Sequence, residues 1–180
     1  KTGIKLHTGE KNGPNIIPRP WVKELMADLI KILPGADFWA GGPEVSYDAE
    51  KFLTENSEFK GVMVGEGEET FKELAGYYVE KNPQDLKNMT GICYRDGDQI
   101  IHNGWRQIMD LSSIPFIYKD LSEFKNRIIY YESSRGCPFS CSYCLSSIDK
   151  KLRFRDTETV KKELQFFIDN KVPQVKFVDR

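Results

Sequence analysis

Two short apolar runs in the first half of the chain each end in a glycine-rich turn that is followed by a helical pattern. Phe38-Trp39-Ala40 precedes Gly41-Gly42, and Val62-Met63-Val64 precedes Gly65-Glu66-Gly67. This alternation is typical of a parallel α/β layer, in which the turns after the strands form the ligand-facing edge. Apolar spacing predicts helices over residues 21–33, 49–53 and 68–80.

The pattern changes after Pro83. Ile92-Cys93-Tyr94 and Gln99-Ile100-Ile101-His102 flank an Asp96-Gly97 pair, which predicts an antiparallel hairpin appended to the layer. The following segment, 110–126, contains Ser112-Ser113 and Pro115 and has few periodic positions. We expect it to link two domains.

The last third of the chain has the order strand, loop, helix, strand. A strand-like run at 127–131 leads directly into a cysteine-rich loop. Asp156 or Thr157 is a suitable N-cap for a helix with Val160, Leu164, Phe167 and Ile168 on one face, and 175–178 is a second buried strand. This is how a (β/α) barrel begins. The first residue is Lys1 and the last follows a strand, so we expect an internal piece of a longer enzyme, inactive by itself.

Three of the four cysteines lie within eight positions, Cys137-Pro-Phe-Ser-Cys141-Ser-Tyr-Cys144. Clustering of this kind favours metal binding in a reducing compartment over a disulfide framework. The C-x3-C-x2-C spacing lets one short loop place three thiolates around a corner of a [4Fe-4S] cluster. The fourth iron would stay open, and the amino and carboxylate groups of S-adenosylmethionine suit it.

Other interpretations of the cysteines stay open. A structural zinc site would make the chain a binding module without catalysis, and it would need a fourth ligand such as Cys93 or His102. Disulfide pairing is a further alternative. An electron-transfer protein would normally hold its cluster with four cysteines. For Cys93 itself, a buried thiol acting as a small hydrophobe is the favoured interpretation.

The cysteine loop resembles that of the radical S-adenosylmethionine (radical SAM) superfamily, in which the loop follows the first barrel strand. By this resemblance Cys137, Cys141 and Cys144 bind a [4Fe-4S] cluster, and Tyr143 packs beside the adenine of S-adenosylmethionine. Val178-Asp179-Arg180 stands where many members have a glycine-rich segment. The resemblance implies reductive cleavage of S-adenosylmethionine, with an electron donor such as flavodoxin or ferredoxin.

The first half is similar to the C-terminal part of the cobalamin-binding domain that precedes the barrel in many B12-type radical enzymes. The likeness rests on Gly41-Gly42-Pro43-Glu44-Val45-Ser46 and on Val64-Gly65-Glu66-Gly67-Glu68. It implies that Gly41, Gly42, Gly65, Glu66 and Gly67 lie against the cobalamin. The chain lacks the Asp-x-His-x-x-Gly motif, and its histidines are His7 and His102, so no histidine here would ligate cobalt.

The resemblance gives an expected fold and domain organisation. The fold class is α/β: the C-terminal part of a Rossmann-like (flavodoxin-like) cobalamin-binding domain with a β-hairpin, then the start of a radical SAM partial TIM barrel. The expected boundaries are 1–109, a linker at 110–126, and 127–180. Methyl transfer through cobalamin and hydrogen abstraction from a substrate of unknown identity are both compatible with this organisation, and no catalytic side chain is assigned.

Composition excludes several other classes. The chain has 26 basic and 27 acidic residues and a net charge of -1, which gives no nucleic-acid signal. Its apolar runs are far shorter than the roughly 20 residues of a membrane helix, so we expect a cytoplasmic protein. A basic run of Lys150, Lys151, Arg153 and Arg155 follows the cysteines, and we expect it to form a solvated face.

Overall fold

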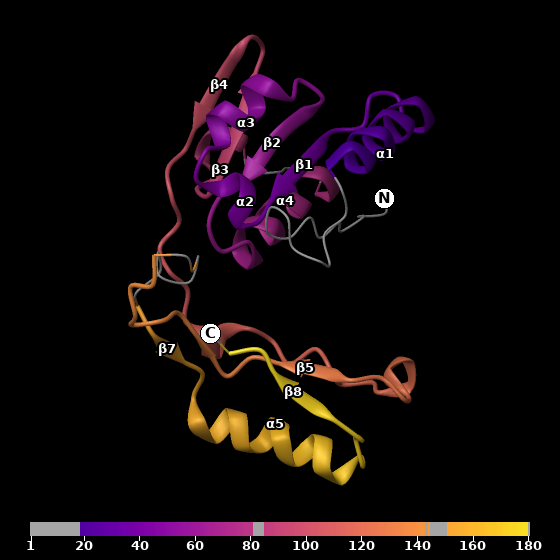
Figure 1. The fold of residues 1–180 in the computed structure, drawn as a ribbon, viewed down its shortest axis with the longest axis vertical. Coiled ribbons are helices and arrows are strands. Elements are labelled where there is room, and N and C mark those ends of the chain that lie inside the picture. Colours follow the sequence, from indigo (N-terminus) through magenta and orange to yellow (C-terminus); the bar gives the residue numbers. More distant parts are fainter. Residues whose placement is uncertain (1–18, 81–84, 143, 145–150, 180) are drawn as a thin grey trace. The chain divides into compact units, whose positions relative to one another are not determined.

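The computed structural model describes residues 19–80, 85–142, 144 and 151–179. The chain divides into two compact units, Lys1–Gln107 and Ile108–Arg180. Figure 1 colours the first unit indigo to rose and the second rose to yellow. Both units combine helices with short strands, so the fold class is α/β.

The first unit is built on a four-stranded sheet with the order β1-β2-β3-β4. β1 (Phe38–Gly41) runs parallel to β2 (Phe59–Met63). β3 (Ile92–Asp96) is antiparallel to β2 and forms a hairpin with β4 (Gln99–His102). The turn contains Gly97 with φ of 59°, a conformation that glycine adopts without steric cost. The predicted hairpin is confirmed.

Helices cover both faces of this sheet. The helical segments of the unit are α1 (Arg19–Ile32), α2 (Pro43–Ser46), α3 (Ala49–Glu55), α4 (Glu68–Val79) and the short η1 (Leu86–Asn88). On one face α3 packs on the sheet, with a core of Ala49, Leu53, Val62, Val64 and Cys93. The other face carries α4 and η1, with a core of Leu74, Leu86, Met89, Ile92 and Tyr94. The unit is therefore a three-layer structure (Figure 1).

The second unit begins a parallel α/β arrangement. β5 (Ile129–Tyr131) is parallel to β8 (Val175–Phe177), and α5 (Thr157–Asp169) connects them. The Asp156 carboxylate caps α5 by accepting a 2.8 Å hydrogen bond from the Thr159 amide. The strand, helix and strand predicted from the sequence are confirmed. A separate pair of two-residue strands, β6 (Ser134–Arg135) and β7 (Arg153–Phe154), is antiparallel; the sequence pattern did not indicate it.

Segment 110–126, expected to be a linker, belongs to the second unit by its contacts. It contains two 3-10 turns, η2 (Leu111–Ser113) and η3 (Ser122–Phe124). Its aromatic residues stack at ring-centroid distances of 5.2–5.9 Å on one another and on α5. Phe116, Tyr118, Leu121 and Phe124 surround the core residues Ile129, Tyr131 and Phe167. The segment thus covers the βαβ unit.

Three helices bury less of their apolar faces than the periodicity predicts. In α1, Trp21 is 66% exposed and Met26 is buried. Phe71 of α4 and Ile168 of α5 are 60% and 68% exposed, whereas Leu74 and Phe167 are buried. Within the described residues, no helix combines the length and the apolar character needed to cross a membrane.

Candidate functional site

The cysteine loop of the second unit is closed at its base by β6 and β7. Ser134 pairs with Phe154 and Arg135 with Arg153, so the chain entering the loop lies beside the chain leaving it. Gly136 is buried at this base, with φ of 96°. A Cβ at Gly136 would overlap the backbone carbonyl of Lys151. Glycine is therefore required here both by conformation and by the close approach of two backbones.

Asp179, two residues after the end of β8, holds the entering arm of the loop. Its Oδ1 accepts hydrogen bonds from the backbone amides of Ser133 (2.6 Å) and Ser134 (2.9 Å). Its Oδ2 accepts a third bond, 2.6 Å long, from the Ser133 hydroxyl. Sequence reasoning assigned Asp179 no role.

The three clustered cysteines lie beyond this base, with Cys141 exposed and Cys137 and Cys144 partly buried. All four cysteines of the chain are described, and they form no disulfide. The Cys144 amide donates a 3.2 Å hydrogen bond to the Cys141 carbonyl, which closes a turn. Among the described residues, no three His, Cys, Asp or Glu side chains are gathered in a metal-holding arrangement. Tyr143 lies outside the described residues.

These thiols match an iron-sulfur cluster in chemical type and in chain spacing. Thiolates are the usual ligands of such clusters, and the anchored loop base brings the chain carrying all three to the carboxyl end of β5. In parallel α/β structures this end of the strands carries the active site. The donor set therefore fits the cluster that the sequence predicts.

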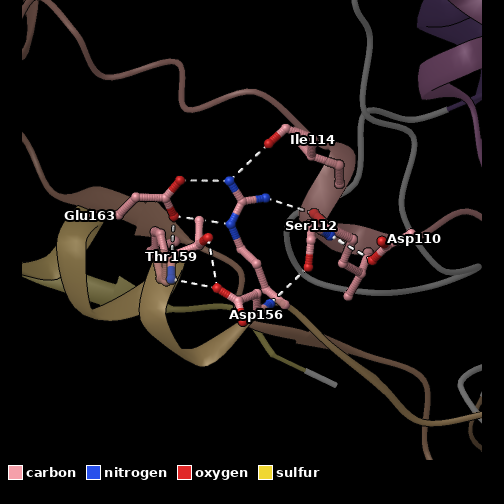
Figure 2. Close-up of polar contacts among 9 residues, drawn as sticks. Asp110, Ser112, Ile114, Asp156, Thr159 and Glu163 are labelled. Carbon is pink, nitrogen blue, oxygen red and sulfur yellow. Dashed lines mark hydrogen bonds and ion pairs between the residues drawn. The ribbon is translucent and has the colours of Figure 1, made fainter.

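The leaving arm of the loop is held by a buried ion pair between Arg155 and Glu163 of α5. The guanidinium contacts both carboxylate oxygens, at 2.6 Å through Nη2 and 3.0 Å through Nε. It also donates to the carbonyls of Leu111 (2.7 Å) and Ile114 (2.8 Å), as Figure 2 shows. Arg155 thus ties η2, β7 and α5 together.

Arg155 corrects the expectation that the basic run forms a solvated face, because its side chain is 7% exposed. Glu163 raises the pKa of Arg155 through hydrogen bonding. Tyr131 completes the group by donating a 2.6 Å hydrogen bond to Glu163; burial, followed by this bond, raises the pKa of Tyr131. The group is structural, and a charged residue at position 163 within the apolar face of α5 was the sequence signal for it.

In the first unit, one serine joins the two glycine turns at the carboxyl ends of β1 and β2. The Ser46 hydroxyl donates to the Gly42 carbonyl at 2.8 Å and accepts from the Gly65 amide at 3.3 Å. Ser46 is 3% exposed. The structure therefore brings Gly41-Gly42 and Gly65-Glu66-Gly67 together, and Ser46 is a residue of this edge that sequence reasoning missed.

The glycines of this edge differ in their surroundings. Gly42, with φ of 101°, and Gly67 have open space where a Cβ would be. A Cβ at Gly41 would lie 3.2 Å from the Met63 methyl group, and one at Gly65 would lie 3.2 Å from the Trp105 ring. Packing thus accounts for Gly41 and Gly65, whereas Gly42 and Gly67 leave backbone accessible to a ligand.

Two half-exposed aromatic side chains border the same edge. Trp105 packs over Gly65, and its ring centroid lies 5.4 Å from that of Tyr47. Tyr47 is 49% exposed and Trp105 50%. Neither residue belongs to the apolar pattern of a predicted element, so no sequence signal indicated the pair.

The residues considered as a fourth zinc ligand are engaged within the first unit. Cys93 is fully buried under α3, and burial raises the pKa of its thiol to about 11. His102 accepts a 2.9 Å hydrogen bond from the Gly104 amide through Nδ1. The interpretation of Cys93 as a buried hydrophobe is confirmed.

Similarity searches connect the chain to named proteins, although no family model matches it. An uncharacterized methyltransferase of Pyrococcus horikoshii is 30% identical over 77% of this chain and 32% of its own length. The anaerobic magnesium-protoporphyrin IX monomethyl ester cyclase of Cereibacter sphaeroides is 26% identical over 82% of this chain and 26% of its own. The cobalamin-dependent radical SAM methyltransferase TokK of Streptomyces tokunonensis is 26% identical over 78% of this chain and 22% of its own.

The chain belongs to the B12-binding radical SAM superfamily. It spans a third or less of the length of these curated relatives.

Solved structures share the fold of this B12-binding radical SAM protein. It matches the cobalamin-dependent S-adenosylmethionine radical enzyme OxsB, bound to aqua-cobalamin and S-adenosylmethionine, with a TM-score of 0.66 and 20% identity over 91% of this chain and 24% of OxsB. The match to the radical S-adenosylmethionine methyltransferase TsrM of Kitasatospora setae has a TM-score of 0.61 and 17% identity, over 88% of this chain and 32% of TsrM. The α/β fold expected from the sequence is confirmed.

Proposed function

We propose that this chain carries the junction of a cobalamin-dependent radical SAM methyltransferase. The first unit corresponds to the C-terminal part of the cobalamin-binding domain, with its expected boundary at residue 109. The second carries the first strand, cysteine loop, helix and second strand of the barrel, expected over 127–180. The observation that carries the proposal is the anchored loop with three thiols at the carboxyl end of β5.

Each predicted site residue has a role in this proposal. Cys137, Cys141 and Cys144 hold a [4Fe-4S] cluster that, when bound, supplies the electron for cleavage of S-adenosylmethionine. Tyr143 packs beside the adenine. The loop base, closed by β6 and β7, restricts the conformations of the ligand-bearing backbone. A flavodoxin or ferredoxin is the kind of donor that would reduce the cluster.

The glycine edge of the first unit is proposed to face cobalamin. Gly42 and Gly67 leave backbone accessible there, and Ser46 fixes the spacing of the two turns. Gly41, Gly65 and Glu66 complete the edge. Methyl transfer is favoured over hydrogen abstraction by the relatives named as methyltransferases.

Anaerobic reconstitution tests the cluster. The chain is incubated with iron and sulfide, desalted, and compared with a variant in which all three cysteines of the loop are replaced by Ala. We expect about four irons per chain and a brown [4Fe-4S] absorption spectrum that requires the cysteines. One tightly held zinc without cluster uptake would instead support the binding-module interpretation.

Gel filtration with hydroxocobalamin tests the glycine edge. Gly42→Leu places a side chain in the accessible space, and Gly97→Leu makes the same change at another positive φ with open surroundings. We expect the cobalamin absorption to co-elute with wild type and Gly97→Leu but not with Gly42→Leu. Equal co-elution of all three chains would contradict the assigned edge.

A further inference from the structure

Ser133 is the point at which both arms of the cysteine loop and β8 meet. Its amide and hydroxyl both donate to Asp179, as described above. Its carbonyl accepts a 2.8 Å hydrogen bond from the Arg155 amide on the leaving arm. Every polar group of Ser133 is thus engaged, and the Asp179 carboxylate is the partner of two of them.

The groups that converge on Asp179 are all donors: two backbone amides and one hydroxyl. A carboxylate accepts with both oxygens and gives short, charge-assisted hydrogen bonds. An asparagine at the same place could keep its oxygen toward the two amides and donate its NH2 group to the Ser133 hydroxyl, which can also accept. It would lack the negative charge that strengthens all three bonds, so the arrangement favours the carboxylate over a neutral side chain of the same size.

Asp179 lies where the paired strands β5 and β8 end. The Val178 amide next to it donates to the Tyr131 carbonyl at 2.9 Å, so the end of β8 lies against the end of β5. Cys137 follows Ser134 by three residues. The backbone that leads to the first cysteine is thus held at Ser133 and Ser134 by a residue 42 positions beyond Cys137.

We propose that Asp179 is a positioning residue for the iron-sulfur site: its carboxylate fixes the Ser133-Ser134 amides and thereby the backbone that presents Cys137 to the cluster. This inference rests on the proposed function. It adds a residue outside the cysteine motif. Loss of the negative charge weakens the hold on the entering arm of the loop, while β5, α5 and β8 keep their own hydrogen bonds and packing.

The test compares Asp179→Asn with Asp169→Asn. Asp169 is an exposed carboxylate near the end of α5 that accepts a hydrogen bond from Gln165 at 2.7 Å, so its variant controls for the loss of one negative charge. Amide hydrogen exchange is measured first on the metal-free chains. In Asp179→Asn, we expect exchange at Ser133 and Ser134 to be several-fold faster, because charge-assisted hydrogen bonds are replaced by weaker neutral ones.

The reconstituted chains are then compared by the rate of iron transfer to a chelator and by the electron paramagnetic resonance spectrum of the reduced cluster. We expect faster iron loss and a shifted spectrum in Asp179→Asn, with circular dichroism and the α5 amides unchanged. Ser133→Ala removes only the hydroxyl bond and should give a smaller effect in the same direction. It serves as the second probe if Asp179→Asn fails to fold.

The outcomes separate the two proposals. Unchanged exchange at Ser133 and Ser134 overturns the positioning role, whatever the cluster does. Faster exchange with an unaltered spectrum and unaltered iron retention also overturns it. In that case Asp179 would stabilise the Ser133-Ser134 backbone without influencing the cluster. If wild type takes up no cluster, the proposed function fails and this inference with it. The exchange data then report separately whether Asp179 holds the Ser133 and Ser134 amides.

Discussion

The Arg155 guanidinium and the Glu163 carboxylate form a two-point ion pair in which the side chains are 7% and 9% exposed. Two charges so far from water are tolerated because the remaining donors and acceptors are also used, by Tyr131 and by two backbone carbonyls. The pair joins the segment before the barrel strand to the helix after the cysteine loop.

Glu163→Gln should therefore destabilise the second unit. Removing one partner of a buried pair leaves the other charge uncompensated, and we expect a loss of about 3 kcal/mol in the free energy of unfolding. The three tryptophans lie in the first unit, so amide exchange of α5 is the appropriate measurement. Glu158→Gln is the control: its partner Lys161 is 2.8 Å away and both are exposed, so its effect should stay below about 0.5 kcal/mol. Equal effects would refute a special role for the buried pair.

Gly136→Ala should displace the base of the cysteine loop. The new methyl group would overlap the Lys151 carbonyl, in addition to the strain of a positive φ. Gly97→Ala has a positive φ but open surroundings. It therefore measures only the free-energy cost of placing alanine at a positive φ, roughly 1–2 kcal/mol. Limited proteolysis should cleave the loop of Gly136→Ala several times faster than that of Gly97→Ala. Identical cleavage would show that the two backbones can separate freely.

Ser46→Ala should uncouple the two glycine turns. The Gly65 amide loses its acceptor, and we expect its hydrogen exchange to rise and the stability of the first unit to fall by about 1 kcal/mol. NMR-detected exchange and urea unfolding followed by tryptophan fluorescence measure the two effects. Ser57→Ala, at an exposed position, should leave both unchanged. If Gly65 stays protected in Ser46→Ala, Trp105 rather than the hydroxyl holds this turn.

Cys93 should be the last cysteine to react with iodoacetamide in the native metal-free chain. Its thiol is buried and its pKa is raised to about 11, so the reactive thiolate is rare at pH 8. The folded chain holds this proton more tightly than the unfolded chain, whose cysteines ionise near pH 9. Its contribution to stability is therefore complete below pH 9 and is lost as the pH rises toward 11. Peptide mapping after timed alkylation checks the order, and rapid labelling of Cys93 at pH 8 would contradict it.

Local signals carried much of the fold. The Asp-Gly pair predicted the β3–β4 hairpin, and Asp156 predicted the start of α5, because turns and caps depend on neighbouring residues. The glycine turns after β1 and β2 were predicted for the same reason. These elements needed no knowledge of distant contacts.

Contacts between distant positions could not be predicted in the same way. Arg155 lies in a basic run, and nothing in that run distinguishes the one side chain that finds a buried carboxylate. Asp179 and Ser133 are 46 positions apart, and no sequence pattern marks the Asp179 carboxylate as the acceptor of the Ser133 hydrogen bonds. Segment 110–126 lacked periodicity, because its aromatic side chains pack one by one onto the βαβ unit and not along one face of a helix.

The reversal of direction between β2 and β3 has a topological consequence. β1 and β2 share a carboxyl edge, whereas β3 presents its amino end there. Within the described residues, β1 has a sheet partner on one side only. Because β3 separates β2 from β4, a longer polypeptide could extend the uninterrupted parallel run only beside β1, and the ligand-facing edge of that run would widen away from the hairpin.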